Sequence, residues 1–176
     1  MGVTQQEPEE RRRRLTVMRH AKAEGFEKAD HDRQLAPRGR TDAEAAGQWL
    51  AGIGPSPDAA LVSAAARARE TWELVAEAAG WSCEAQLSEP LYGAGPESAL
   101  DLIRETPDDV GSLVVVGHNP TAAYVAQVLD DGGGDLTMDM AVGFPTSAVA
   151  VFDLTGAWAD LVEGGCRLVA FWVPDR

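Results

Sequence analysis

Short apolar runs alternate with longer amphipathic segments along most of this chain, and the alternation predicts its fold. Helical patterns, with apolar residues every three or four positions, occupy 37–53, 64–79, 96–105 and 120–129. Strand-like runs lie at 15–19, 59–63, 112–117, 146–153 and 167–173, with a weaker one near 83–87. We therefore expect an α/β fold: one three-layer α/β/α domain with a mostly parallel central sheet and helices on both faces.

Two parts of the chain depart from this alternation. Only a turn-rich segment separates the runs at 146–153 and 167–173, so these two strands can pair antiparallel. Residues 1–14 are polar and charged without periodicity. We expect them to form a flexible tail ahead of a domain that covers 15–176.

The composition is that of a single globular domain, with 176 residues, of which 45% are hydrophobic and 24% charged. No apolar run approaches the roughly 20 residues needed to span a bilayer, and no signal-peptide core opens the chain. Cys83 and Cys166 are far apart and form no C-x-x-C pair. We therefore expect a cytoplasmic protein that keeps both thiols reduced and does not associate with membranes.

The formal net charge of −13 disfavours nucleic acid as a partner, because binding to phosphate backbones needs clustered cations. The one basic cluster, Arg11–Arg14, follows three nearby glutamates. A solvated tail is the favoured interpretation of this cluster, and a nucleic-acid arm is the alternative. If such an acidic protein handles a phosphorylated substrate, its positive potential has to be concentrated in one pocket.

Polar side chains stand at the ends of three predicted strands. The first strand ends in Arg19-His20, the second in Ser63 with Arg67 one turn into the next helix, and the third is followed by His118. Because the carboxyl ends of parallel strands meet at one edge of a sheet, we expect these groups to converge there. A single histidine at a strand end is usually solvated or capping, but independent accidents would not place all of these groups on one edge.

The turn after the third strand has its own local explanation. Asn119 suits the N-cap of the following helix and Pro120 suits its first position. Two other segments resemble ligand sites only superficially. The three adjacent residues of Asp30-His31-Asp32 cannot all point into one coordination sphere, so we expect no metal there. The stretch "DDGGGD" at 130–135 lacks the G-x-G-x-x-G order and does not follow a strand, and no cofactor is expected.

Four segments in order resemble the histidine phosphatase superfamily, the phosphoglycerate mutase-like proteins, and most closely its short SixA-like phosphohistidine phosphatases. These segments are "LTVMRHAKAE", "DRQLAPRGRTDA", "LVSAAARARETWEL" and "VVVGHNP", and the resemblance covers about residues 15–155. Ala21 stands where the superfamily often has glycine, and Ala64 where it usually has proline. Neither change touches a reacting side chain, so they affect loop geometry more than chemistry.

The resemblance implies that His20 is the nucleophile that accepts the phosphoryl group. A neutral imidazole attacks well near neutral pH, whereas the second histidine is more useful when protonated, so we expect the two pKa values to differ. Guanidinium forks can stabilise the transferring group without a metal. Arg33, in the R-x-L-x-x-x-G motif, borders the pocket mouth or else anchors a loop. The phosphate-binding residues that we expect are Arg19, Arg67, His118, Asn119 and Arg33.

The general acid is the open question of the predicted site. Larger relatives place a glutamate in an L-x-E-x-x-Y-G setting, which Glu89 matches here. Glu89 is therefore a candidate acid, or else a plain loop carboxylate. A phosphoester needs a proton on its leaving alkoxide, whereas phosphohistidine can leave as neutral imidazole, so the acid is dispensable for the second substrate.

The sequence thus predicts a metal-independent phosphatase that works through a covalent phosphohistidine at His20. Only 51 positions separate Arg67 from His118 (118 − 67), which leaves little room for a roof over the site. An open site suits phosphohistidine on a protein surface. The alternatives are a phosphatase of a small phosphorylated metabolite, a non-catalytic phosphate-binding module, and a metal-dependent hydrolase built on His20, His31 and nearby acids.

Overall fold

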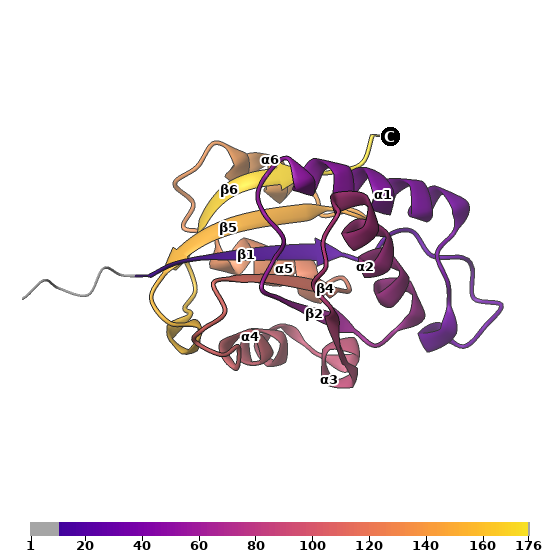
Figure 1. Ribbon diagram of the computed structural model, residues 1–176, viewed down its shortest axis with the longest axis horizontal. Helices are drawn as coiled ribbons and strands as arrows, with labels where there is room; N and C mark the ends of the chain where they lie inside the picture. Colours follow the sequence, from indigo (N-terminus) through magenta and orange to yellow (C-terminus); the bar gives the residue numbers. More distant parts are fainter. Residues whose placement is uncertain (1–10, 176) are drawn as a thin grey trace, which may run out of the picture.

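The computed structural model of the protein describes residues 11–175, which form a central sheet between two layers of helices (Figure 1). The strands are β1 (Arg12–Arg19), β2 (Ala59–Ser63), β3 (Ala85–Ser88), β4 (Ser112–Gly117), β5 (Val149–Thr155) and β6 (Arg167–Trp172). The α-helices are α1 (Pro37–Ala51), α2 (Ala66–Ala79), α3 (Glu89–Gly93), α4 (Pro96–Arg104), α5 (Thr121–Leu129) and α6 (Leu136–Val142). Two short 3-10 helices, η1 (Asp30–Asp32) and η2 (Trp158–Asp160), complete the described chain.

The six strands lie in the order β3-β2-β4-β1-β5-β6. The first four in this order are parallel to one another, whereas β5 is antiparallel to both β1 and β6. The predicted α/β fold with a mostly parallel sheet is confirmed, and so is the antiparallel pairing of the last two strands. β1 and β4 occupy the centre of the sheet, so their carboxyl ends lie side by side.

Alternating side chains of the central strands pack into two separate cores. Leu15 and Val17 of β1 point to one face, where they pack with apolar residues of α4 and α5. Met18 points to the opposite face, which α1 and α2 cover (Figure 1). This two-residue alternation is that of a strand buried on both faces. It fixes β1 firmly in the sheet and therefore fixes the position of the residues that follow it.

The predicted helices are present, and their ends lie within two residues of the predicted limits. Two helices were not predicted, α3 and α6, which span five and seven residues. Neither is long enough for an apolar period to repeat, so a pattern search does not find them. No helix in the described part of the chain is long and apolar enough to cross a membrane. Cys83 and Cys166 are free thiols.

The predicted tail boundary at residue 14 is wrong for residues 12–14, because β1 begins at Arg12. The Arg13 residue is only 6% exposed and donates hydrogen bonds to the carbonyls of Gly156 and Asp108. Arg14 is paired with Asp153 of β5 at 2.9 Å. The polar arginine residues gave no hydropathy signal for a strand. Their guanidinium groups nevertheless form hydrogen bonds and an ion pair that hold this end of β1 in the sheet. The rest of the predicted tail, residues 1–10, lies outside the described residues.

Candidate active site

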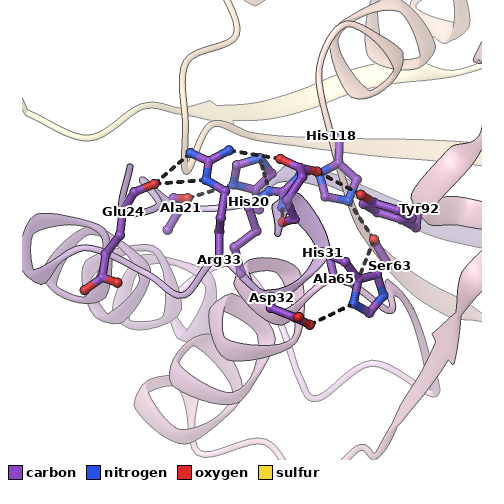
Figure 2. Close-up of polar contacts among 12 residues, drawn as sticks. His20, Ala21, Glu24, His31, Asp32, Arg33, Ser63, Ala65, Tyr92 and His118 are labelled. Atoms are coloured by element: carbon purple, nitrogen blue, oxygen red, sulfur yellow. Dashed lines mark hydrogen bonds and ion pairs between the residues drawn. The ribbon is translucent and has the colours of Figure 1, made fainter. Parts of the chain in front are cut away.

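Strand order brings the two catalytic-candidate histidines together. Arg19 of β1 is in register with Gly117 of β4, and the backbone N–H of His20 donates to the Gly117 carbonyl at 2.9 Å. His20 and His118 are thus the first residues after two neighbouring parallel strands. Their ring centroids are 5.0 Å apart, and Figure 2 shows the two rings side by side. The predicted convergence at the carboxyl edge of the sheet is what the geometry shows.

His20 is held in the protonation state of a nucleophile. Its Nδ1 lies 2.7 Å from the Ala21 carbonyl, and because a carbonyl only accepts, Nδ1 carries the hydrogen and Nε2 carries the lone pair. The Arg67 Nε–H donates to this Nε2 at 3.3 Å. Burial lowers the pKa of His20 to about 3, and the charges of His118, Arg67 and Arg19 act in the same direction. The ring is therefore neutral near pH 7, with its lone pair at the phosphate-binding arginine.

His118 is oriented by a hydroxyl at the end of β2. The Ser63 Oγ lies 2.6 Å from the His118 Nε2. The His118 Nδ1 is buried and has no hydrogen-bond partner among residues 11–175. Burial and then the Arg67 charge lower the pKa of His118 to about 4. The expected split, with one histidine neutral and the other protonated, is therefore absent in the ligand-free protein, where both rings are neutral.

The two site arginines differ in how they are held. The Arg67 side chain, at the start of α2, is 7% exposed, and its Nη2 donates to a carboxylate oxygen of Asp30 at 3.0 Å. The Arg19 Nη1 donates to the Phe144 carbonyl at 3.2 Å, and burial lowers the pKa of this guanidinium. The Arg19 Nε is buried without a partner in the described chain. Both groups thus keep N–H donors that a bound anion can take.

Asp30 is a site residue that sequence reasoning missed. Its Oδ2 accepts from Arg67 and from the Tyr92 hydroxyl at 2.8 Å, and its Oδ1 accepts from the Arg33 Nη1 at 3.1 Å. The Tyr92 hydrogen bond is the largest cause that lowers the pKa of Asp30 to about 2, followed among the lowering causes by the two arginines. The available signals were the Tyr of the L-x-E-x-x-Y-G setting and the Asp-His-Asp run considered only for metal.

Tyr92 closes the other side of the histidine pair. Its ring packs edge-on against His118, with centroids 5.6 Å apart, and against His31 at 4.9 Å. In Figure 2, Tyr92 lies next to His118, on the side away from His20. η1 and α3 are therefore linked over the site by contacts among Asp30, His31 and Tyr92.

Arg33 reaches the site only through Asp30. Its Nε and Nη2 both donate to the Glu24 carbonyl, at 3.0 and 2.8 Å, and its guanidinium lies 4.0 Å over the Phe26 ring. This is the loop-anchoring arrangement considered as the alternative to a pocket-mouth position. Arg33 holds the segment between β1 and α1 in place and orients the Asp30 carboxylate.

Glu89 and Asn119 lie outside the ring of contacts around the histidines. The Glu89 side chain is 70% exposed at the start of α3, and its carboxylate is 3.4 Å from the His31 Nε2. The Asn119 Nδ2 donates to the Phe144 carbonyl at 2.8 Å, and its Oδ1 accepts from the Ala123 N–H. The N-cap of α5 is Pro120 rather than Asn119. Asn119 thus fastens the start of α5 to the loop that also holds Arg19.

A glycine and a threonine of the sequence motifs position the loop after His20. The Thr71 Oγ1 accepts from the Ala21 N–H at 2.9 Å and donates to the Arg67 carbonyl at 2.6 Å, which ties the loop to α2. A Cβ at Gly39 would stand 2.0 Å from the Lys22 carbonyl oxygen. The glycine of R-x-L-x-x-x-G therefore permits α1 to pack directly on the backbone two residues beyond His20.

The acidic run at η1 points in divergent directions. Asp30 binds the site arginine, whereas Asp32 is exposed and meets only the His31 Nδ1, at 3.4 Å. Within residues 11–175, no three His, Cys, Asp or Glu side chains are arranged to hold a metal ion.

Comparisons with known proteins agree with this geometry. The model of the histidine phosphatase superfamily (branch 1) matches residues 15–112. An uncharacterized protein of Mycobacterium tuberculosis (strain H37Rv) is 43% identical over 163 residues, which cover 89% of this chain and 99% of that protein. A structure from Nakamurella multipartitia, whose proposed identity is the phosphohistidine phosphatase SixA, is 34% identical with a TM-score of 0.81, covering 93% of this chain and 96% of that one.

A second structure with the same proposed identity, from Agrobacterium tumefaciens, is 32% identical with a TM-score of 0.77, and the match covers 92% of this chain and 98% of that one. Both structural matches cover more than nine tenths of this chain. The chain belongs to the histidine phosphatase superfamily and is a phosphatase of its SixA-like branch.

Proposed function

We propose that this phosphatase works through a covalent phosphohistidine at His20 and that its substrates are phosphohistidine side chains of other proteins. One observation carries the first part: the His20 Nε2 bears an available lone pair beside the Arg67 guanidinium, because Nδ1–H is bound to the Ala21 carbonyl. In the first step Nε2 attacks phosphorus and the leaving group departs. In the second step water attacks the phosphoenzyme and releases inorganic phosphate.

The surrounding donors suit a transferring phosphoryl group. Such a group spreads negative charge over three oxygens, and positioned N–H donors stabilise it. Arg19, Arg67 and the unpartnered Nδ1 of His118 offer these donors. A bound phosphoryl anion also raises the pKa of His118, because a nearby negative charge favours the charged ring.

The substrate class follows from what stands over the site. Only β3 and the short helices α3 and α4 lie between the end of α2 and the start of β4 (Figure 1). Glu89 is mostly solvent-exposed, and Asp30 is held ionised by its donors. Neither is a buried acid ready to protonate an alkoxide. An open site without such an acid favours a phosphoramidate, whose imidazole can leave neutral, over a phosphoester.

Rapid-quench labelling tests the covalent step. The protein is mixed with a ³²P-phosphohistidine peptide, quenched within milliseconds, and assayed for base-stable, acid-labile label. The wild type should be labelled, and His20→Asn should lose the label and at least about 10⁴-fold in turnover, since the nucleophile is gone. The control is His31→Asn, which removes a histidine that contacts neither His20 nor Arg67 in the structure. Wild-type turnover without any label would disprove His20 as the nucleophile.

The alternatives predict different results in the same assay. A non-catalytic phosphate-binding module would bind phosphate in His20→Asn but never acquire label. A metal-dependent hydrolase would lose turnover in EDTA, whereas the proposed mechanism predicts that EDTA leaves turnover unchanged. A phosphatase of small phosphorylated metabolites would turn over phosphoesters faster than phosphohistidine and depend on Glu89. The predicted location in the cytoplasm, which two free thiols support, is likewise proposed.

A further inference from the structure

The carboxylate of Asp30 is held close to the reacting nitrogen by a single guanidinium group. The Arg67 Nε donates to the His20 Nε2 at 3.3 Å, and the Nη2 of the same side chain donates to the Asp30 Oδ2 at 3.0 Å. One rigid planar group therefore separates the nucleophile from this carboxylate. The Asp30 carboxylate thus borders the same guanidinium group that contacts the reacting nitrogen.

Asp30 is fixed in place yet still accessible. Tyr92 and Arg33 hold its two oxygens at 2.8 and 3.1 Å, but its side chain remains 46% exposed. Each oxygen can accept more than one hydrogen bond, so the exposed edge retains acceptor capacity for a ligand.

An ionised carboxylate cannot serve as the general acid for an ester. Its hydrogen bonds keep the pKa of Asp30 at about 2, so it has no proton to give near pH 7. It is instead a strong acceptor for an N–H donor. Among phosphorylated leaving groups, an N-phosphorylated imidazole gains such a donor when its second ring nitrogen takes a proton from solvent, whereas a phosphorylated hydroxyl has no nitrogen that could do so.

We propose that Asp30 is the residue that selects phosphohistidine over phosphoesters, by accepting a hydrogen bond from the distal N–H of the substrate ring in its protonated, imidazolium form; this rests on the proposed function. In the step, the His20 Nε2 lone pair forms a bond to phosphorus and the P–N bond of the substrate breaks. The electron pair of that bond returns to the substrate ring. The ring keeps its distal proton, bound to Asp30, and leaves as neutral imidazole.

The same charge acts against ester substrates. A carboxylate beside the phosphate pocket repels a phosphate dianion and occupies donors of Arg67 that the dianion would use. Asp30 thus lowers the affinity for every phosphorylated ligand. Only a ligand whose leaving group carries an N–H donor regains that affinity, through a hydrogen bond to Asp30. Selectivity arises from attraction to one leaving group and repulsion of the others.

Two peptides that differ at one position, with phosphohistidine in one and phosphoserine in the other, provide the test. In Asp30→Asn, kcat/KM for the phosphohistidine peptide should fall about tenfold or more, as for loss of one charge-assisted hydrogen bond. The phosphoserine value should rise, and the binding of inorganic phosphate measured by calorimetry should tighten. Asp32→Asn is the matched control, because Asp32 is exposed and touches only His31; its selectivity should equal that of the wild type.

Tyr92→Phe gives an independent check if Asp30→Asn folds poorly. It leaves the carboxylate in place but removes one of the donors that fix it, so the ratio of the two kcat/KM values should fall by a smaller factor. An unchanged ratio in both variants, whether each activity falls equally or neither does, would overturn the role of Asp30. Wild-type label at His20 together with that unchanged ratio would spare the proposed function. Absence of phosphohistidine turnover in the wild type would overturn both.

Discussion

Arginines stand at both ends of strand β1, and the two ends do different things. At the amino end, Arg13 and Arg14 donate to backbone carbonyls and pair with Asp108 and Asp153 of neighbouring segments. At the carboxyl end, Arg19 forms no ion pair with any of residues 11–175 and donates to one carbonyl. Two neutral histidines stand beside it, and none stands at the amino end.

The difference shows that the density of basic residues in a sequence does not locate an anion site. The amino end is the more basic stretch, yet the guanidinium groups of Arg11, Arg13 and Arg14 are bound to carbonyls or carboxylates of the fold. The carboxyl end has fewer cations, but Arg19 lies beside His20, the nucleophile that we propose. A phosphate site needs donors that folding has not already used, at a place where chemistry can follow.

Exchanging one arginine at each end should separate these roles most clearly. Arg67→Gln, at the carboxyl edge, should lower kcat/KM about 10³-fold, because a preorganised donor to the transferring group is lost. Arg14→Gln removes a half-exposed ion pair and should cost less than about 1 kcal/mol of stability, without changing turnover per folded molecule. Steady-state kinetics with circular dichroism measures both. An equal fall in kcat/KM in the two variants would contradict the distinction between a functional carboxyl end and a structural amino end.

Acid should destabilise the carboxyl end selectively. The pKa values of His20 and His118 are lowered to about 3 and about 4, so the stability they contribute is complete above the unfolded value near 6.5 and is lost as pH falls toward the folded values. Between pH 6 and 5 the free energy of unfolding should drop by about 1.4 kcal/mol per pH unit for each histidine. Urea unfolding across this range measures the slope.

The double variant His20→Asn/His118→Asn is the control for this slope. It lacks both titrating rings, so its stability should change little between pH 6 and 5. Arg13→Met, at the amino end, should keep the wild-type slope, because no histidine stands there. Identical slopes in the wild type and the double variant would show that the two rings are not held neutral.

The amino end should matter for stability instead. Arg13→Met leaves the Gly156 and Asp108 carbonyls without their buried donor, which should cost about 1–3 kcal/mol. Turnover per folded molecule should stay at the wild-type value. Thermal unfolding and active-site titration measure the two quantities. A loss of turnover with unchanged melting temperature would place Arg13 in function rather than in the fold.

The sequence predicted the sheet and the convergence of the strand-end residues, because both follow from local apolar runs and from the geometry of parallel strands. It did not predict that β1 begins at Arg12, since no hydropathy pattern distinguishes an arginine that is solvated from one bound to carbonyls. The same limit explains Asp30. Its partners, Arg67 and Tyr92, are brought to it by tertiary structure, at separations of 37 and 62 positions.

Protonation states were also beyond the sequence. The usefulness of a protonated donor suggested a charged second histidine, but burial, which no local pattern reports, lowers the pKa of both rings. The orientation of the Asn119 side chain could not be predicted from the sequence either. Asn119 fits a helix cap by its position before Pro120, yet its side chain is used by Phe144 and Ala123. Which atoms remain free for a ligand depends on the packing of the whole domain.

The smallest predicted effect concerns how a neutral His118 acts as a donor. A hydroxyl that donates to Nε2 leaves the hydrogen on Nδ1, the atom without a partner in the described chain. Ser63→Ala removes this constraint, so the ring can take the other tautomer and offer a lone pair to the phosphate. Turnover should fall about tenfold, the effect of one lost hydrogen bond, with little change in melting temperature. ¹⁵N NMR of the ring reports the tautomer, and Ser63→Thr, which retains the hydroxyl, should keep the Nδ1–H form. A wild-type tautomer in Ser63→Ala would mean that packing, rather than Ser63, sets the donor at the carboxyl end of the strand.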